Sequence, residues 1–339
     1  MAATSDEVFQ RLPTNVVPEK YFIDYEVIDL MNFRFEGAER VQLRVQEAGS
    51  RTITCHALEL YVHDVSVELP AAAPDTAPRT LACEQIQYVS KDDTVQLHFG
   101  EELPLGALVT LQLRFQGVLN DQLRGFYRSE YDLHKEKRVL AVTQFEACDA
   151  RRAFVCWDEP AIKARFVISM VTDADLVALS NMHVVQTLVR PKKNAKVRAL
   201  SRKDAPVEKL WKFAETPVMS TYLVAMVVGE FDMLTGISKE GVIVSVYTAP
   251  GQSERGRFSL DVALQALSFF TKRFGVPYPL KKLDMVAIPD FLGAMENWGL
   301  VTYSESYLLI DEKLSSQQIK MLTARVVCHE LSHQWFGNL

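Results

Sequence analysis

The sequence predicts an α+β protein, in which a long β-rich part precedes a shorter part that contains helices. Apolar residues occupy every second position in several stretches of the first ~230 residues, which is typical of half-buried strands. After residue 232 apolar residues recur at helical spacing instead. A length of 339 residues suits about two domains. We therefore expect a β-rich domain over residues 1–232 and a second domain over residues 233–339.

Composition and charge exclude several classes of protein. Hydrophobic residues make up 48% and charged residues 24%, as in an ordinary globular protein. The net charge of −6 gives no basic surface for nucleic acid, and no apolar run approaches the ~18 residues that suggest a membrane span. The first residues lack the features of a signal peptide, and five scattered cysteines suit reduced thiols. We therefore expect a cytoplasmic protein that binds neither nucleic acid nor membrane.

The β-rich part contains three clear strand patterns, at residues 41–45, 58–62 and 111–115, where apolar and polar residues alternate. Residues 69–78 are rich in alanine, proline and aspartate and predict a loop. Residues 187–209 carry eight lysines and arginines. A solvated hairpin is the favoured interpretation of this basic stretch, and a binding site for an acidic partner is the alternative.

In the second part, valines at alternate positions over residues 242–246 predict one more strand. A helix should follow, because four apolar residues recur at helical spacing: Leu260, Leu264, Leu267 and Phe270. Lys272 and Arg273 suit its last turn, and Gly275 suits its C-cap.

A second helix should begin near Ser315, with Gln318 three residues later completing a capping box. Its core-facing side is expected to carry Ile319, Leu322 and Val326. The helix would extend through residues 329–333, and Gly337 could end it.

This predicted helix carries the motif His329-Glu330-Leu331-Ser332-His333. Positions i and i+4 share one face of a helix, so both histidines can bind one metal ion, with Glu330 beside it as a general base. The alternative is a pair of core histidines, but burying them and a glutamate without a partner is costly. The pattern therefore predicts a zinc site. The adjacent Cys328 is interpreted as a buried thiol, with an additional metal ligand as the alternative.

Two further segments carry acidic residues in non-helical surroundings. In the segment 293–300, Gly293 and Gly299 flank Glu296, and glycines allow a backbone to approach a ligand closely. In the segment 143–159, Glu146 follows a predicted strand and precedes a rim of charged residues. Taken alone, Glu296 is typical of an exposed turn, and the segment around Glu146 is typical of a strand and turn.

Taken together, these motifs resemble the zinc aminopeptidases of the gluzincin group, the family of aminopeptidase N. Residues 293–297 are similar to the exopeptidase motif G-A-M-E-N of that family, and residues 329–333 match its zinc motif. Residues 125–129, 143–147, 150–160, 218–224 and 277–280 also look like the family. The resemblance covers nearly the whole chain, from about Phe9 to Leu339.

The resemblance implies a saddle-like N-terminal domain, followed by the start of a thermolysin-like catalytic domain. It implies that His329 and His333 bind zinc and that Glu330 is the general base. Glu296 would bind the free α-amino group of a peptide, with help from Glu146. The rest of the substrate-binding segment would be Gly293, Ala294, Met295 and Asn297. The expected activity is removal of N-terminal residues from peptides with a free N-terminus.

The sequence departs from the family at its end. The third zinc ligand of the family is a glutamate roughly nineteen residues after the second histidine, which would fall beyond Leu339. The family's tyrosine that stabilises the tetrahedral intermediate would also lie further on. We therefore expect an incomplete catalytic domain and little or no activity from this chain. The alternative is a non-catalytic truncated form that acts as a peptide- or partner-binding module.

Overall fold

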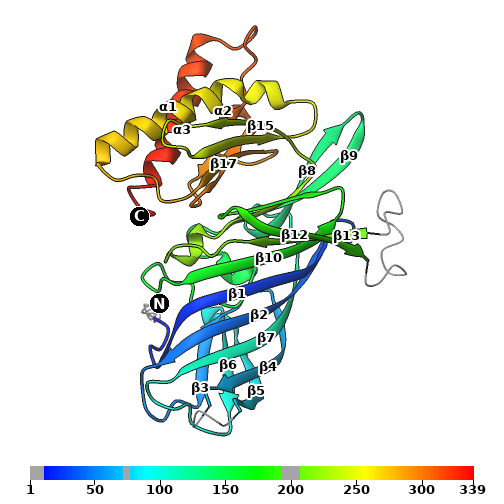
Figure 1. The fold of residues 1–339 in the computed structure, drawn as a ribbon. Helices are drawn as coiled ribbons and strands as arrows, with labels where there is room; N and C mark the ends of the chain where they lie inside the picture. The colour runs from blue at the N-terminus through cyan, green and yellow to red at the C-terminus, as the bar shows by residue number, and fades with distance from the viewer. Residues whose placement is uncertain (1–10, 72–76, 193–206) are drawn as a thin grey trace, which may run out of the picture.

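The computed structural model describes residues 11–71, 77–192 and 207–339 and confirms the α+β class (Figure 1). Its strands form sheets of ten, four and five strands. The first two sheets precede residue 232, and the helices of more than one turn all follow that residue within the described ranges.

The ten-stranded sheet has the order β12-β13-β10-β1-β2-β7-β4-β5-β6-β3. Neighbouring strands are antiparallel except β1 and β10, which are parallel. Alternate residues of β2 and β7 are buried, which confirms the strands predicted at 41–45 and 111–115. The strands of this sheet are β1 Val16–Asp29, β2 Arg34–Val45, β3 Thr52–His56, β4 Tyr61–Leu69, β5 Arg79–Val89, β6 Thr94–Phe99, β7 Leu108–Val118, β10 Arg165–Asp173, β12 Val184–Pro191 and β13 Val207–Phe213.

The strand predicted at residues 58–62 is wrong in its first half. Leu58 and Glu59 lie in a bend, Leu60 has no regular structure, and β4 begins only at Tyr61. The reason is the backbone of Glu59, whose φ of 58° is incompatible with an extended strand. The loop predicted from residue 69 begins one residue later, because Leu69 is the last residue of β4, and residues 72–76 of that loop lie outside the described residues.

The basic stretch forms a hairpin in its described part, where β12 and β13 are antiparallel. Most of β12 is exposed, and Arg190 forms an ion pair with Glu208 at 2.8 Å. Strands β12 and β13 therefore confirm the solvated hairpin over the residues that the structure describes. The remaining basic residues, between 193 and 206, lie outside the described residues.

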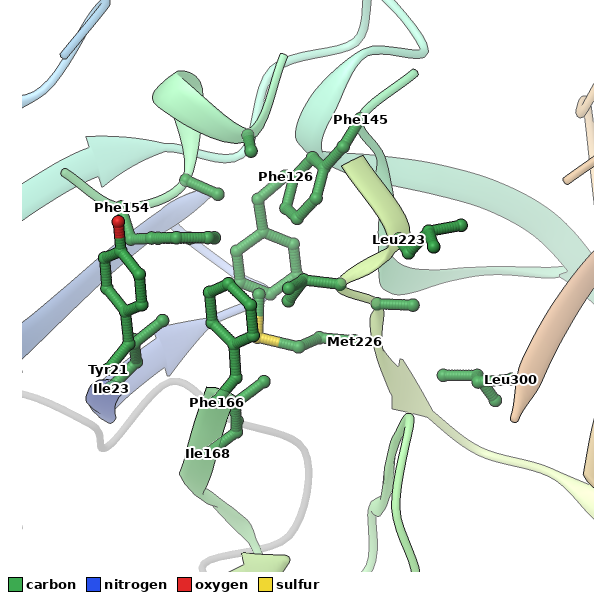
Figure 2. Packing of buried hydrophobic residues seen from close by; sticks show 14 of the residues in the cluster. Tyr21, Ile23, Phe126, Phe145, Phe154, Phe166, Ile168, Leu223, Met226 and Leu300 are labelled. Atoms are coloured by element: carbon green, nitrogen blue, oxygen red, sulfur yellow. The ribbon is translucent and has the colours of Figure 1, made fainter. Parts of the chain in front are cut away.

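The four-stranded sheet has the order β11-β14-β9-β8 and packs against the large sheet through aromatic side chains. Phe126 of the four-stranded sheet meets Tyr25 and Phe35 of the large sheet with ring centroids 5.5 and 5.3 Å apart. Next to them, Tyr21 stacks on Phe166 at 4.8 Å, and Phe154 meets both of these rings edge-on. Figure 2 shows this cluster extending towards Leu223 and Leu300. The strands of this sheet are β8 Gly125–Leu133, β9 Glu136–Gln144, β11 Val177–Ser180 and β14 Met226–Gly229, and the 3-10 turns near them are η2 Ala150–Arg152 and η3 Thr221–Leu223. A further 3-10 turn, η1 Ser90–Asp92, joins β5 to β6 in the ten-stranded sheet.

The five-stranded sheet has the order β15-β16-β17-β19-β18, with β17 parallel to both of its neighbours. Every residue of β17 is buried, as expected for a strand covered on both faces. Figure 1 shows the helices on the side of this sheet that faces away from the ten-stranded sheet. The elements are β15 Asp232–Ile237, β16 Ile243–Thr248, β17 Lys282–Ile288, β18 Ala294–Met295, β19 Leu300–Ser304, η4 Ser253–Gly256, α1 Arg257–Phe274, α2 Glu305–Leu308 and α3 Gln317–His333.

The first predicted helix is confirmed as α1, and the strand at 242–246 is confirmed as β16. Leu260 and Leu267 are buried, and Gly275 caps the helix with a φ of 70° while its N–H donates to the carbonyl of Thr271. Lys272 and Arg273 lie in the last turn, as predicted.

The second predicted helix exists as α3, but its details differ. The N-cap is Ser316, whose hydroxyl accepts from the N–H of Ile319, so the capping box of Ser315 and Gln318 is wrong. Ile319 and Leu322 are 43% and 42% exposed, because the buried stripe is instead Thr323, Val327 and Leu331, which are four residues apart. The helix ends at His333, before Gly337, as the chain turns at Gln334. No helix among the described residues is both long and apolar enough to cross a membrane.

Candidate active site

Helix α3 directs both histidines of the motif to one point. The Nε2 atoms of His329 and His333 are 3.2 Å apart, and the two rings are nearly perpendicular at 84°. Nδ1 of His333 lies 3.2 Å from the carbonyl oxygen of Phe336, to which its N–H donates. That bond leaves Nε2 of His333 with its lone pair free, which is the state that binds a metal.

The separation of the two Nε2 atoms fits a metal ion. With metal–nitrogen bonds of ~2.0–2.1 Å, two ligands of a tetrahedral zinc lie ~3.3 Å apart. The observed 3.2 Å therefore suits two neighbouring positions on one ion. Within residues 11–71, 77–192 and 207–339, however, no three His, Cys, Asp or Glu side chains gather as a metal-binding group. The described chain thus offers two ligands.

Glu330 lies next to the histidine pair and is buried, with 6% of its surface exposed. Burial, followed by the nearby carboxylates of Glu296 and Glu146, raises the pKa of Glu330 to about 8. Its Oε2 atom has no hydrogen-bond partner within the part of the chain that the structure describes. An unpaired carboxylate oxygen of raised basicity is suited to accepting a proton.

Cys328 is half-buried and packs against the hydrophobic core. Burial raises the pKa of its thiol, which disfavours the thiolate that would bind a metal. This environment supports the interpretation of a buried thiol.

The segment around Glu296 is the edge of the five-stranded sheet. Strand β18 is antiparallel to β19, and Ser304 donates its N–H to the carbonyl of Gly293 at 2.8 Å. Gly293 has a φ of 97°, with open space where a Cβ would lie. Gly293, Ala294 and Glu296 are half-buried, whereas the side chains of Met295 and Asn297 are each only 1% exposed. The residues of this segment that a ligand can reach are therefore Gly293, Ala294 and Glu296.

Glu146 reaches the same place from the four-stranded sheet, since it follows the end of β9. Its pKa is raised by partial burial and by Glu296, while His333 opposes the shift. The mutual influence of Glu146, Glu296 and Glu330 shows that the fold brings three carboxylates within electrostatic reach of the histidine pair. Such a concentration of negative charge favours a cationic ligand.

The structure adds one aromatic residue that the sequence did not single out. Tyr222, in the turn η3, is half-buried, and its pKa is raised by burial and then by Glu296 and Glu146. Its phenol therefore lies near both amine-binding candidates. Residues 218–224 resemble the family as a whole segment, but no pattern within them distinguishes Tyr222 from its neighbours.

Comparison with known families agrees with this arrangement. The profile of the Peptidase M1 N-terminal domain matches residues 17–223, and that of the Peptidase family M1 domain matches residues 258–339. The chain is 46% identical to aminopeptidase M1-B of Oryza sativa subsp. japonica over 99% of its own length and 36% of the relative.

Two other relatives extend this similarity to a second plant and an animal. The chain is 45% identical to aminopeptidase M1 of Arabidopsis thaliana, over 97% of its own length and 35% of the relative. It is 40% identical to the puromycin-sensitive aminopeptidase of Caenorhabditis elegans, over 98% of its own length and 33% of the relative. The chain thus spans about a third of the length of these relatives. Because the first profile alone covers more than half of the sequence, and the second follows it in the expected order, this chain belongs to peptidase family M1.

Proposed function

We propose that this chain carries the amine-binding and metal-binding part of a zinc aminopeptidase site, which removes N-terminal residues from peptides. One observation carries the proposal: Glu146, which follows a strand of the four-stranded sheet, lies within electrostatic reach of His333 and of Glu296, which follows a strand of the five-stranded sheet. The carbonyl of Glu296 in turn accepts a hydrogen bond from Gln334, the residue after His333. The family and the names of the relatives support the same activity.

His329 and His333 would hold the zinc ion, with a further ligand from outside the described residues. When bound, the ion supplies a Lewis acid that polarises the scissile carbonyl and lowers the pKa of water to ~7. Glu330, whose Oε2 has no hydrogen-bond partner among the described residues, would take a proton from the attacking water and return it to the leaving amine.

Glu296 and Glu146 would bind the ammonium group at the N-terminus of the substrate. An ammonium between two carboxylates relieves their repulsion and gains charge-assisted hydrogen bonds, which an acylated N-terminus cannot make. The fixed distance from these carboxylates to the histidine pair would explain the removal of one residue at a time.

The substrate backbone would lie along the sheet edge at Gly293 and Ala294. Strand β18 ends the order of the five-stranded sheet, so an extended peptide can pair with its outer side. Since the side chains of Met295 and Asn297 are buried, these two residues would contribute through their backbone and their packing.

Two wider proposals accompany this function. The division into residues 1–232 and 233–339 is supported by β15, which starts the five-stranded sheet at Asp232. A cytoplasmic location is supported by the five cysteines, all of which are free thiols.

Ligand binding tests the function directly. The purified chain loaded with zinc should bind leucine amide more tightly than N-acetyl-leucine amide in a calorimetric titration. Glu296→Gln should remove most of this preference, whereas Glu312→Gln, at an exposed site before α3, should retain it. Equal binding of the two amides by the parent chain would refute the proposal.

Turnover tests the extent of activity. Since the described residues supply two metal ligands, we expect hydrolysis of an aminoacyl-amide reporter at least ~10² slower than by an intact family member. Turnover near that of the intact enzyme, abolished by Glu330→Gln, would contradict this expectation.

The missing third ligand among the described residues favours one alternative, a non-catalytic module that binds peptides or a protein partner. In that case Glu330→Gln should leave peptide binding unchanged, and zinc should not be required for it.

A further inference from the structure

The residue after the second histidine, Gln334, is completely buried and uses both ends of its side-chain amide on the segment that carries Glu296. Its Nε2 donates to the carbonyl oxygen of Glu296 at 3.0 Å, and its Oε1 accepts from the N–H of Gly299 at 3.1 Å. Asn338 donates a second bond to the same Glu296 carbonyl at 2.8 Å. The side chain of Gln334 thus connects the end of α3 with both ends of residues 296–299.

The opposite side of this segment is held by Asn181, which follows β11 of the four-stranded sheet and is 2% exposed. Its Nδ2 donates to the carbonyls of Trp298 and Leu223 at 3.0 and 2.7 Å, and its Oδ1 accepts from the N–H of Ala225 at 2.9 Å. Residues 296–299 are therefore fixed between α3 and the four-stranded sheet.

The backbone of Asn181 lies so close to Gly299 that a side chain at this position would not fit. This residue has a φ of 80°, and a Cβ there would lie 2.4 Å from the carbonyl oxygen of Asn181. The Nζ of Lys282 donates to the carbonyl of Gly299 at 2.8 Å and to that of Ser180 at 2.7 Å. A segment bonded on both sides in this way can move only if buried polar groups lose their partners.

We propose that Gln334 is a positioning residue, which sets the place of the Glu296 carboxylate relative to the two histidines of α3. This inference rests on the proposed function, because it assigns Gln334 a role through the amine-binding residue. Asn338 is the weaker candidate, since its Oδ1 has no partner among the described residues. The geometry makes Gln334 the only one of the two that holds the segment at two points.

Three variants separate the bonds of Gln334. Gln334→Met keeps the length of the side chain and loses both bonds. Gln334→Glu, in its ionised form, keeps an acceptor for the N–H of Gly299 and loses the donor to Glu296, so its measurements are made above the pKa of the new carboxyl. Gln318→Met is the matched control, because Gln318 is exposed on the first turn of the same helix.

The first measurement is hydrogen exchange of the Gly299 amide, which does not depend on any ligand. Gln334→Met should raise its exchange rate about tenfold or more, whereas Gln334→Glu and Gln318→Met should leave it near that of the parent. Unchanged exchange in Gln334→Met would overturn the two-point attachment.

The second measurement is the affinity of the zinc-loaded chain for leucine amide and for N-acetyl-leucine amide. Gln334→Met and Gln334→Glu should weaken the binding of leucine amide about tenfold or more, with binding of the acetylated amide and of zinc unchanged within about threefold. In a Glu296→Gln background, Gln334→Met should have less than about a twofold effect, because it acts through Glu296. If Gln334→Met does not fold, Gln334→Glu is used in its place to compare the affinities for the two amides.

The outcomes separate the inference from the function on which it rests. If the parent does not prefer the free amine, both fail. If Glu296→Gln weakens leucine amide binding but Gln334→Met and Gln334→Glu behave like Gln318→Met, only the positioning role fails. Additive effects of Gln334→Met and Glu296→Gln would also overturn it, since a merely structural residue acts independently of the amine contact.

Discussion

The buried Glu39 in β2 allows us to predict whether the free energy of unfolding rises or falls with pH. Its side chain is 1% exposed, and Oε2 accepts from the N–H of Val155 at 3.1 Å. Oε1 has no hydrogen-bond partner among the residues that the structure describes. Burial raises the pKa of Glu39 well above its usual value, and the single bond from Val155 offsets only part of that effect. Tyr21, Tyr25 and Cys156 are among its neighbours, and none of them supplies a positive charge.

A raised pKa in the folded state means that folding binds a proton at Glu39. The resulting stabilisation is fully present below the pKa of the unfolded chain and is lost as pH rises through the folded pKa. Between those two values the parent should lose about 1.4 kcal/mol per pH unit relative to a variant without this proton. Glu39→Gln is that variant, because glutamine has the same shape and stays neutral.

The assay is urea unfolding of the parent and Glu39→Gln from pH 5 to pH 8. We expect the difference in unfolding free energy to move in favour of Glu39→Gln as pH rises. The control is Glu36→Gln, a half-buried site on the same strand whose ion pair with Arg34 is near the surface. A constant difference for Glu39→Gln across this range, or a shift in favour of the parent, would refute the assignment of a neutral buried acid.

Three further predictions concern the second part of the chain. Lys282→Met should destabilise the protein by about 3–5 kcal/mol in urea unfolding, because it leaves the buried Asp284 without its partner at 2.7 Å. Adding Asp284→Leu should recover the part of this loss that is due to the unpaired carboxylate, while the carbonyls of Ser180 and Gly299 still lack their donor, and no recovery would contradict the reasoning. Gly299→Ala should lower the unfolding free energy by at least about 2 kcal/mol, owing to a φ of 80° and a carbonyl oxygen 2.4 Å from the new Cβ, and a cost near zero would show that the segment can relax. His333→Ala should abolish zinc binding in a chelator competition, whereas Cys328→Ser should change the zinc affinity by less than about threefold, and a larger effect would make the thiol a ligand.

Sequence periodicity predicted the strands and the first helix because each of these elements has a single apolar face that can be buried. In β2 and β7 the apolar residues occupy one set of alternate positions, so only one face can be buried. In α1 the stripe through Leu260 and Leu267 is confirmed, and Gly275 marks its end unambiguously.

Helix α3 shows where the same reasoning fails. It carries two interleaved stripes, one through Ile319 and Leu322 and another through Val327 and Leu331. Periodicity alone favours the first, because Ile319, Leu322 and Val326 recur at spacings of three and four residues from the start of the helix. Packing against α1 and the sheet selects the second, and this information is absent from the local sequence.

Some residues of the candidate site could likewise be predicted from the sequence, and others could not. The histidine pair was predictable because its members are four residues apart on one helix, and the glutamates were identified through a family motif. Tyr222 and Gln334 were missed because nothing in their immediate sequence indicates a role. Their importance comes from the residues they reach, which are distant in the chain.

The two carboxylates proposed to bind the substrate amine are divided between two sheets, since Glu146 follows β9 and Glu296 follows β18. Their relative position therefore depends on the contact between the two sheets, and buried bonds of Asn181 and Lys282 hold that contact together. A carboxylate pair within one loop would keep its spacing when the contact loosened, whereas this pair would separate. The proposed selectivity for a free N-terminus is thus expected to be as stable as the contact between the sheets, and more sensitive to its disruption than the spacing of His329 and His333, which lie on one turn of α3.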